Sequence, residues 1–337
     1  MSGFEVRRLT PGDRRAWDAL LALSPGCGFM QTWDWSLFKE IEGYDALRFG
    51  VFEGERLRGG AIAYSFPSPA EAGMLAMPDG PILPWREPGA PAMFDALMEA
   101  LRDAPEAGRA VTLRVEPRLT EAPACLRSWT RSPLDLVPDE TLEVPLGPEA
   151  DMLARMTQKG RYNVGLAARR GVEVRSSAAI GDVHEFYFVL SQAARYQNFR
   201  IEPKSFFINL AGSLFPERAR FAFATYRGVT LGAALTVRFG DTATYLYGGL
   251  VPLFRSVMAS YALHAHLLRE AAREGYRVYD FYGYVPRDKA GHPYYGFSRF
   301  KERFGGTPVK RMGSRDLILY DRLADAALRI IGASAGA

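Results

Sequence analysis

The stretch Phe52–Leu57 (FEGERL) and the stretch Tyr226–Leu231 (YRGVTL) carry the same pattern in the two halves of a 337-residue chain. In each, an aromatic residue ends an apolar strand, a glycine lies in a short turn, and a leucine begins a second apolar strand, as in a β-hairpin. Apolar residues at helical spacing precede each hairpin twice, in residues 11–24, 31–41, 182–197 and 204–214. The order helix, helix, strand, turn, strand therefore occurs twice. We interpret it as a duplicated unit with its boundary near Pro145–Pro148.

The same analysis predicts the elements around the two hairpins. Strands are expected at residues 47–52, 57–66, 111–115, 221–226, 231–239 and 242–250, and helices at residues 92–103 and about 258–274. Residues 77–81 (MPDGP) have the composition of a loop. The apolar residues 316–320 follow the second unit, and we expect them to return to the first unit as a buried strand.

The composition is that of a folded globular protein, with 48% hydrophobic residues. No apolar run reaches the roughly 18 residues that a membrane helix needs. The first residues lack the apolar centre of a signal peptide, so we expect a cytoplasmic protein. A net charge of +4 permits a polyanionic partner without indicating one. The two cysteines, Cys27 and Cys125, are too few for a disulfide framework, and we expect no metal site.

The stretch His292–Gly306 (HPYYGFSRFKERFGG) combines a turn, five aromatic residues, three cations and a closing pair of glycines. One interpretation is an amphipathic element whose cations only solvate a surface. Residues 276–283, just upstream, have the pattern of a buried strand that ends in a glycine. Loops at strand ends are where binding and catalytic sites are commonly built. The stretch is therefore also a candidate functional site.

The pair FK at residues 300–301 and the triplet FGG at residues 304–306, downstream of DFYG at residues 280–283, resemble the closing signature of the Fem family. Members of that family are aminoacyltransferases that use aminoacyl-tRNA to build the peptidoglycan cross-bridge. The resemblance extends to the helix at residues 31–39 (QTWDWSLFK) and to residues 159–174. It therefore includes both halves of the chain and is densest in the second.

The resemblance implies a catalytic centre at Lys301. Its ammonium would face the oxyanion of a tetrahedral intermediate or the departing ribose oxygen. Phe300 is implied in catalysis beside it, and Phe304 in contact with the substrate. Both rings would fix the backbone of Lys301 and exclude water.

The resemblance also implies an acceptor site formed by Lys39, Arg195 and Tyr247, which would lie along one groove. An anionic, peptide-bearing precursor needs cations for its phosphate or carboxylate and an aromatic wall for its peptide. Two departures from the family pattern lie near the Gly-Pro of the first half, where Asp79 replaces a basic residue and Pro84 stands near an expected acid. No general base can be assigned from that position.

Residues 159–174 (KGRYNVGLAARRGVEV) read as a basic helix that ends at a glycine and is followed by a strand. Its cations are either a solvated face or a stripe that follows RNA phosphates, and the sequence favours neither. We take Lys159, Arg161, Arg169 and Arg170 as candidate tRNA contacts.

Residues 251–260 (VPLFRSVMAS) resemble the acyl-CoA-binding loop of the GNAT acetyltransferases, in which a glycine-rich turn begins a helix. Met258 and Ser260 occupy positions where that loop has glycines, so acetyl-CoA is disfavoured and no cofactor is expected. His264 and His266 point roughly 200° apart on a helix and cannot share a metal ion.

Together these observations predict two tandem GNAT-like α/β domains with mixed sheets: residues 1–146, joined by the returning residues 309–337, and residues 147–308. The resemblance to the Fem family implies transfer of an amino acid from aminoacyl-tRNA to the stem-peptide amine of a peptidoglycan precursor, lipid-linked or UDP-linked. We expect a monomer with peripheral contact at the inner face of the membrane. The alternatives are an N-acyltransferase that uses acyl-CoA and a tRNA-binding protein without catalysis.

Overall fold

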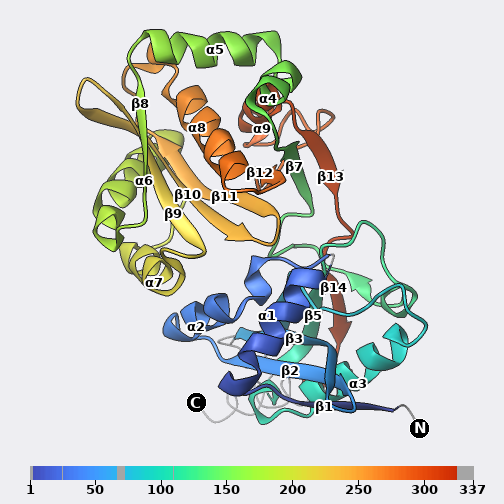
Figure 1. Cartoon of the computed structure of the whole chain (residues 1–337). Helices are drawn as coiled ribbons and strands as arrows, with labels where there is room; N and C mark the ends of the chain where they lie inside the picture. The colour runs from blue at the N-terminus through green and yellow to red at the C-terminus, as the bar shows by residue number, and fades with distance from the viewer. Residues whose placement is uncertain (1–2, 25, 67–72, 109, 325–337) are drawn as a thin grey trace. The chain divides into compact units, whose positions relative to one another are not determined.

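The computed structural model describes residues 3–24, 26–66, 73–108 and 110–324 (Figure 1). The chain divides into two units, one of residues 1–139 with 311–337 and one of residues 140–310. The second unit begins at Glu140 rather than at residue 147, because the strand Glu140–Pro145 pairs with two strands of the second sheet.

The first unit is a seven-stranded sheet with the helices α1, α2 and α3. Its elements are β1 (Phe4–Arg8), α1 (Arg14–Leu23), α2 (Trp33–Ile41), β2 (Ala46–Glu53), β3 (Arg56–Phe66), β4 (Gly73–Pro78), α3 (Ala90–Arg102), β5 (Ala110–Glu116), β6 (Thr130–Arg131) and β14 (Arg315–Ile318). Apolar residues of α3, among them Phe94 and Leu97, pack with the inward residues of the sheet to form its core. The amphipathic spacing of α3 thus fixes which of its faces is buried.

The second unit is also built on a seven-stranded sheet. Its elements are β7 (Glu140–Pro145), α4 (Glu149–Arg155), α5 (Gln158–Arg169), β8 (Glu173–Ser177), α6 (Val183–Gln197), α7 (Lys204–Leu214), β9 (Ala219–Tyr226), β10 (Val229–Phe239), β11 (Thr242–Leu250), α8 (Ala259–Arg273), β12 (Val278–Asp280), α9 (Tyr295–Lys301) and β13 (Thr307–Lys310). Helices α6 and α7 cover one side of the sheet and α8 covers the other (Figure 1).

The two sheets have the same topology. Their strand orders are β1-β2-β3-β4-β5-β14-β6 and β8-β9-β10-β11-β12-β7-β13. In each, one pair near the middle, β4–β5 or β11–β12, is parallel and the other pairs are antiparallel. Each mixed sheet therefore repeats the other strand for strand, which is the topology expected of the duplicated unit.

The units exchange one strand in sequence order. After β5 the chain forms β6 in the first sheet and then β7, which pairs in the second sheet. After β12 it forms β13 in the second sheet and then β14, which pairs in the first sheet. The strand predicted at residues 316–320 thus pairs with β5, over Arg315–Ile318. The chain crosses between the units at residues 139–140 and again at residues 310–311.

Most predicted helices and hairpins are confirmed, but the predicted loop at residues 77–81 is partly wrong. Met77 and Pro78 end β4 and pair with Val115 and Glu116 of the parallel strand β5. The turn residues Asp79–Pro81 begin only after the strand. No helix in the described part of the chain is both long and apolar enough to cross a membrane.

Candidate active site

Lys301 ends α9 with only 3% of its surface exposed, and its ammonium lies against the loop that follows β12. Its Nζ donates to the carbonyl oxygens of Phe281 at 2.9 Å, Tyr282 at 3.4 Å and Gly283 at 2.5 Å. The ring of Phe297 lies 4.4 Å from the same Nζ. An ammonium has three protons, so these carbonyls match its full donor capacity.

The loop that follows β12 takes an unusual conformation that turns these carbonyls toward Lys301. Tyr282 and Gly283 both have positive φ, 47° and 90°. The carboxylate of Asp280 is fully buried and accepts from the Tyr282 N–H at 2.8 Å and from the hydroxyl of Thr141. Burial lowers the pKa of Lys301 to about 7, although the charge of Asp280 acts in the opposite direction.

An aromatic cluster surrounds this loop. Phe304 is 1% exposed and packs on Phe281 and Phe300, with ring centroids 5.5 Å and 5.3 Å away. His264 lies in the same cluster, and its Nδ1 is 3.1 Å from the hydroxyl of Tyr279. Burial, with a smaller contribution from Lys301, lowers the pKa of His264 to about 3, so its ring is neutral at physiological pH. The predicted partners Phe300 and Phe304 therefore lie beside the loop that holds the Lys301 ammonium.

Gly305 closes the short helix η7 (Glu302–Phe304) with φ of 79°, and an added Cβ would lie 2.4 Å from the carbonyl oxygen of Arg155. We expect Gly305→Ala to lower the free energy of unfolding by about 1–3 kcal/mol, because it combines backbone strain with a clash against backbone. Urea unfolding measures this change. Gly212→Ala in α7 is the control, since nothing lies within 4 Å of its added Cβ. The Gly212→Ala variant should stabilise the protein by up to about 1 kcal/mol. If both variants changed the free energy of unfolding equally, Gly305 would not be the site of the strain and the clash.

Arg195 and Tyr247 belong to neighbouring elements of the second unit, α6 and β11. Arg195 lies exposed in the last turn of α6 and, within the described residues, makes no ion pair. Tyr247 packs edge-on against Phe207 of α7, with ring centroids 5.1 Å apart. Burial raises the pKa of Tyr247 above its ordinary value. Tyr247 therefore offers an uncharged, half-buried aromatic surface.

A bulge in β11 determines which side of the sheet Tyr247 faces. The register with β10 shifts so that Leu235 pairs with Tyr247 and Thr236 with Tyr245, which leaves Leu246 as the extra residue. Two tyrosines two positions apart would otherwise share a face. Here Tyr245 packs on His264 of α8, whereas Tyr247 packs on α7.

Lys39, the acceptor contact predicted in the first unit, lies in the last turn of α2. Its Nζ is 3.7 Å from the ring centroid of Tyr44, a cation–π contact that leaves the side chain half-buried. Gln31, at the start of the same motif, has a structural role. Its amide nitrogen donates to Ile62 O at 2.9 Å and Pro78 O at 2.8 Å, which ties β3 to the end of β4.

The predicted basic stripe on α5 is not one line of free cations. Arg161 donates to the carbonyl oxygen of Met156 at 2.5 Å and thereby satisfies the C-terminal end of α4. At about 100° per residue, Lys159 and Arg170 share one edge of α5, while Arg169 lies on its outer face. There Arg169 stacks over the exposed ring of Tyr162, 5.8 Å from its centroid. Three of the four predicted tRNA contacts thus remain exposed without an ion pair among the described residues.

The residues that resemble an acyl-CoA loop lie between β11 and α8. Met258 is the N-cap of α8 and has a φ of 61°, in the left-handed region. A glycine would adopt this conformation without strain and leave the helix N-terminus bare. The side chain of Met258 instead stands at that terminus.

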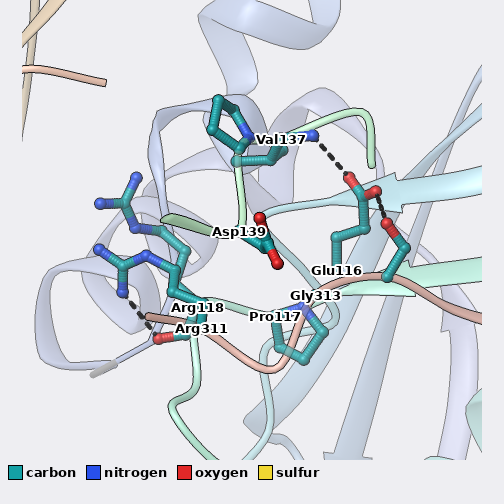
Figure 2. Close-up of a pocket in the computed structure, with 9 residues that line it drawn as sticks. Glu116, Pro117, Arg118, Val137, Asp139, Arg311 and Gly313 are labelled. Carbon is teal, nitrogen blue, oxygen red and sulfur yellow. Dashed lines mark hydrogen bonds between the residues drawn. The ribbon is translucent and has the colours of Figure 1, made fainter. Parts of the chain in front are cut away.

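The first unit contains a small pocket beside Asp139 and Arg311, where the chain leaves the unit and re-enters it (Figure 2). The carboxylate of Glu116 accepts from the N–H groups of Leu136 and Val137, at 2.8 Å and 3.2 Å, and from the hydroxyl of Ser314. Burial raises the pKa of Glu116 to about 7. Sequence patterns did not indicate Glu116, because its partners come from distant segments. The lining residues are Glu116, Pro117, Arg118, Val137, Pro138, Asp139, Arg311, Gly313 and Ser314.

Among the described residues, no group of three or more His, Cys, Asp or Glu side chains could hold a metal ion. Asp79, where the family pattern is broken, is fully buried and accepts from the Met30 N–H at 3.2 Å. It lies 3.9 Å from Arg118. These contacts explain Asp79 as a structural acid.

Comparison with known proteins finds one family match, in the second half of the chain. Residues 225–324, which begin at the end of β9 and include Lys301 and β14, match the FemAB family. No curated protein matched this chain in sequence.

Solved structures extend the likeness to the whole fold. The crystal structure of FemX aligns with a TM-score of 0.82 at 17% identity, covering 95% of this chain and 99% of that one. L-PGS from Bacillus licheniformis aligns with a TM-score of 0.57 at 13% identity over 96% and 98% of the two chains. A tandem GNAT protein from the clavulanic acid biosynthesis pathway gives 0.56 at 15% identity over 94% and 98%. The predicted fold of two tandem GNAT-like domains is confirmed.

Proposed function

We propose that this protein is an aminoacyltransferase that moves an amino acid from aminoacyl-tRNA to the stem-peptide amine of a peptidoglycan precursor. The observation that carries the proposal is the FemAB-family match over the segment that holds Lys301. There a buried ammonium is fixed by three carbonyl groups and an aromatic ring. A fixed positive charge in a water-poor site is suited to acyl transfer from an activated ester.

In the proposed reaction, the amine nitrogen attacks the ester carbonyl, the new C–N bond forms, and the bond to the ribose oxygen breaks. The attacking nitrogen loses a proton and the departing ribose oxygen gains one. Lys301 would stabilise the intermediate oxyanion by exchanging its weakest contact, the Tyr282 carbonyl at 3.4 Å, for the oxyanion. The aromatic residues Phe300 and Phe304 would keep water from the charge.

Lys39, Arg195 and Tyr247 are proposed to bind the acceptor. Arg195 has an exposed guanidinium, and Tyr247 offers an aromatic surface. The donor tRNA is proposed to contact Lys159, Arg169 and Arg170 through its phosphates. The site of action is proposed to be the cytoplasm, and no cofactor takes part.

Two other functions are compatible with the same fold. An acyl-CoA-dependent N-acyltransferase would need the helix terminus that Met258 occupies. A tRNA-binding protein without catalysis would need the cations of α5 but not a buried Lys301. The deciding experiment incubates purified protein with a panel of charged tRNAs, or with acetyl-CoA, and with UDP-linked or lipid-linked precursor. A mass increase of one amino acid on the precursor, dependent on charged tRNA, supports the proposal, and acetylation by acetyl-CoA would replace it.

We expect the triple variant Lys159→Gln, Arg169→Gln and Arg170→Gln to raise the KM for aminoacyl-tRNA about tenfold or more. Each lost phosphate contact should also lower the slope of log affinity against log salt by about 0.7–0.9. Filter binding at several salt concentrations measures both effects. Arg161 is left intact because it stabilises the end of α4.

A control with the same change of charge separates local contacts from net charge. Arg56, Arg86 and Arg127 are exposed in the first unit, and their replacement by glutamine also removes three charges. If this control weakens tRNA binding as much as the α5 variant does, α5 is not the contact surface.

A further inference from the structure

The segment between β11 and α8 projects five consecutive residues from the second unit. Residues 252–256 (PLFRS) are all exposed, and each neighbour in the chain, Val251 and Val257, is buried. The Val251 N–H donates to Leu231 O at 2.9 Å, and the Val257 N–H donates to Phe254 O at 2.9 Å. The start of the segment is thus tied to β10 and its flanking valines are buried, while Leu253 and Phe254 lie on the surface.

Side chains of neighbouring segments join this segment into one surface. Phe254 packs against Tyr226 at 5.4 Å between ring centroids, and the guanidinium of Arg227 lies 5.2 Å from the Tyr226 ring. Arg255 donates to the hydroxyl of Tyr196 at 3.3 Å. We call this surface the 253–255 patch; it consists of Tyr196, Tyr226, Arg227, Leu253, Phe254 and Arg255.

The patch exposes large apolar and aromatic side chains. Leu253 is 54% exposed, Phe254 49% and Tyr196 56%. Phe254 and Arg227 also have positive φ, 46° and 51°, which is a strained conformation for residues other than glycine. Neighbouring exposed apolar residues held in a strained backbone mark an interaction surface rather than a part of the core.

The charge of the patch is positive. Within the described residues, neither Arg227 nor Arg255 makes an ion pair, and both guanidinium groups contact tyrosines. We propose that the 253–255 patch docks the second unit on an anionic membrane surface. Leu253 and Phe254 would enter the interfacial layer, the tyrosine rings would lie at headgroup depth, and the two arginines would meet lipid phosphates.

RNA is the competing partner, because bases stack on aromatic side chains and phosphates bind arginine. Leu253 favours the membrane. An aliphatic side chain at the tip of the segment gains from entering an apolar layer but cannot stack with a base in the manner of an aromatic ring. The proposal does not depend on the proposed acyl transfer, since docking can be measured without turnover.

The test is cosedimentation of the full chain with vesicles of phosphatidylcholine alone or with about 30% phosphatidylglycerol, an anionic lipid. The protein should bind the anionic vesicles and release them as salt rises. Leu253→Ala and Phe254→Ala should each weaken binding by about three- to tenfold. Arg255→Gln should weaken it about fivefold and reduce the salt dependence.

Matched controls are Leu23→Ala and Tyr320→Ala, which remove side chains 84% and 75% exposed in the first unit. They should bind vesicles as the unchanged protein does. The proposal is overturned if the unchanged protein ignores anionic vesicles, or if Leu253→Ala and Phe254→Ala bind them normally. It is also overturned if the patch variants lose binding to a single-stranded RNA oligonucleotide while vesicle binding persists.

Discussion

Lys301→Ala is expected to lower turnover by roughly a hundred- to a thousand-fold while it changes the KM for the acceptor little. Loss of one preorganised charge at a developing oxyanion typically has an effect of about this size. Single-turnover transfer from aminoacyl-tRNA measures it without interference from product release. A rate near that of the unchanged protein would remove Lys301 from the mechanism.

A structural contribution of Lys301 must be separated from the catalytic one. The alanine variant leaves the carbonyls of Phe281, Tyr282 and Gly283 without their donor, which destabilises a buried loop by about 1–3 kcal/mol. Thermal unfolding detects this loss. Lys310→Ala, which removes a lysine side chain 74% exposed in the same unit, is the control for a missing charge.

The dependence of the single-turnover rate on pH tests the catalytic role separately, because a purely structural role of Lys301 would not change it. Burial lowers the pKa of Lys301 to about 7, so the ammonium is fully present below that pH and is lost as pH rises through it. If the ammonium is the active form, the single-turnover rate falls on the alkaline side. His264, with a pKa of about 3, stays neutral throughout and contributes no limb near neutrality. Lys301→Arg keeps its charge at every pH, so any residual activity should lack the alkaline fall.

The sequence predicted the repeated fold because the hairpin pattern depends on local residues. Glycine turns and alternating apolar positions identify β2–β3 and β9–β10 wherever they occur. The exchange of β7 and β14 between the sheets was only partly predictable. The return of residues 316–320 follows from an apolar segment without a local partner, whereas the pairing of residues 140–145 depends on β12 and β13, far along the chain.

The candidate site was predictable in its residues but not in their contacts. The Fem-like signature indicated Lys301, yet nothing in it indicated that three carbonyls of the preceding loop would hold the ammonium. That arrangement depends on positive φ at Tyr282 and Gly283, a property of the folded loop. Arg161 shows the same limit, since a cation within a basic helix serves as the C-terminal cap of α4.

Lys39→Ala and Arg195→Ala are each expected to raise the KM for the acceptor about ten- to a hundredfold, with little change in donor tRNA affinity. A charge-assisted contact to a phosphate or carboxylate contributes about 1.5–3 kcal/mol, which corresponds to that range. Arg195 is free to make such a contact because its guanidinium is exposed and, among the described residues, forms no ion pair. Lys39 would exchange part of its contact with the Tyr44 ring for the ligand.

Arg273→Ala is the matched control for Arg195, because both arginines are exposed in the last turn of a 15-residue helix. It should leave the acceptor KM unchanged, as should Arg86→Ala in the first unit. Steady-state kinetics with the precursor as the varied substrate measure the effect, and filter binding measures donor affinity. The acceptor assignment fails if Arg195→Ala behaves like Arg273→Ala. It fails equally if the Lys39 and Arg195 variants weaken tRNA binding in place of acceptor binding, because the two cations would then belong to the donor site.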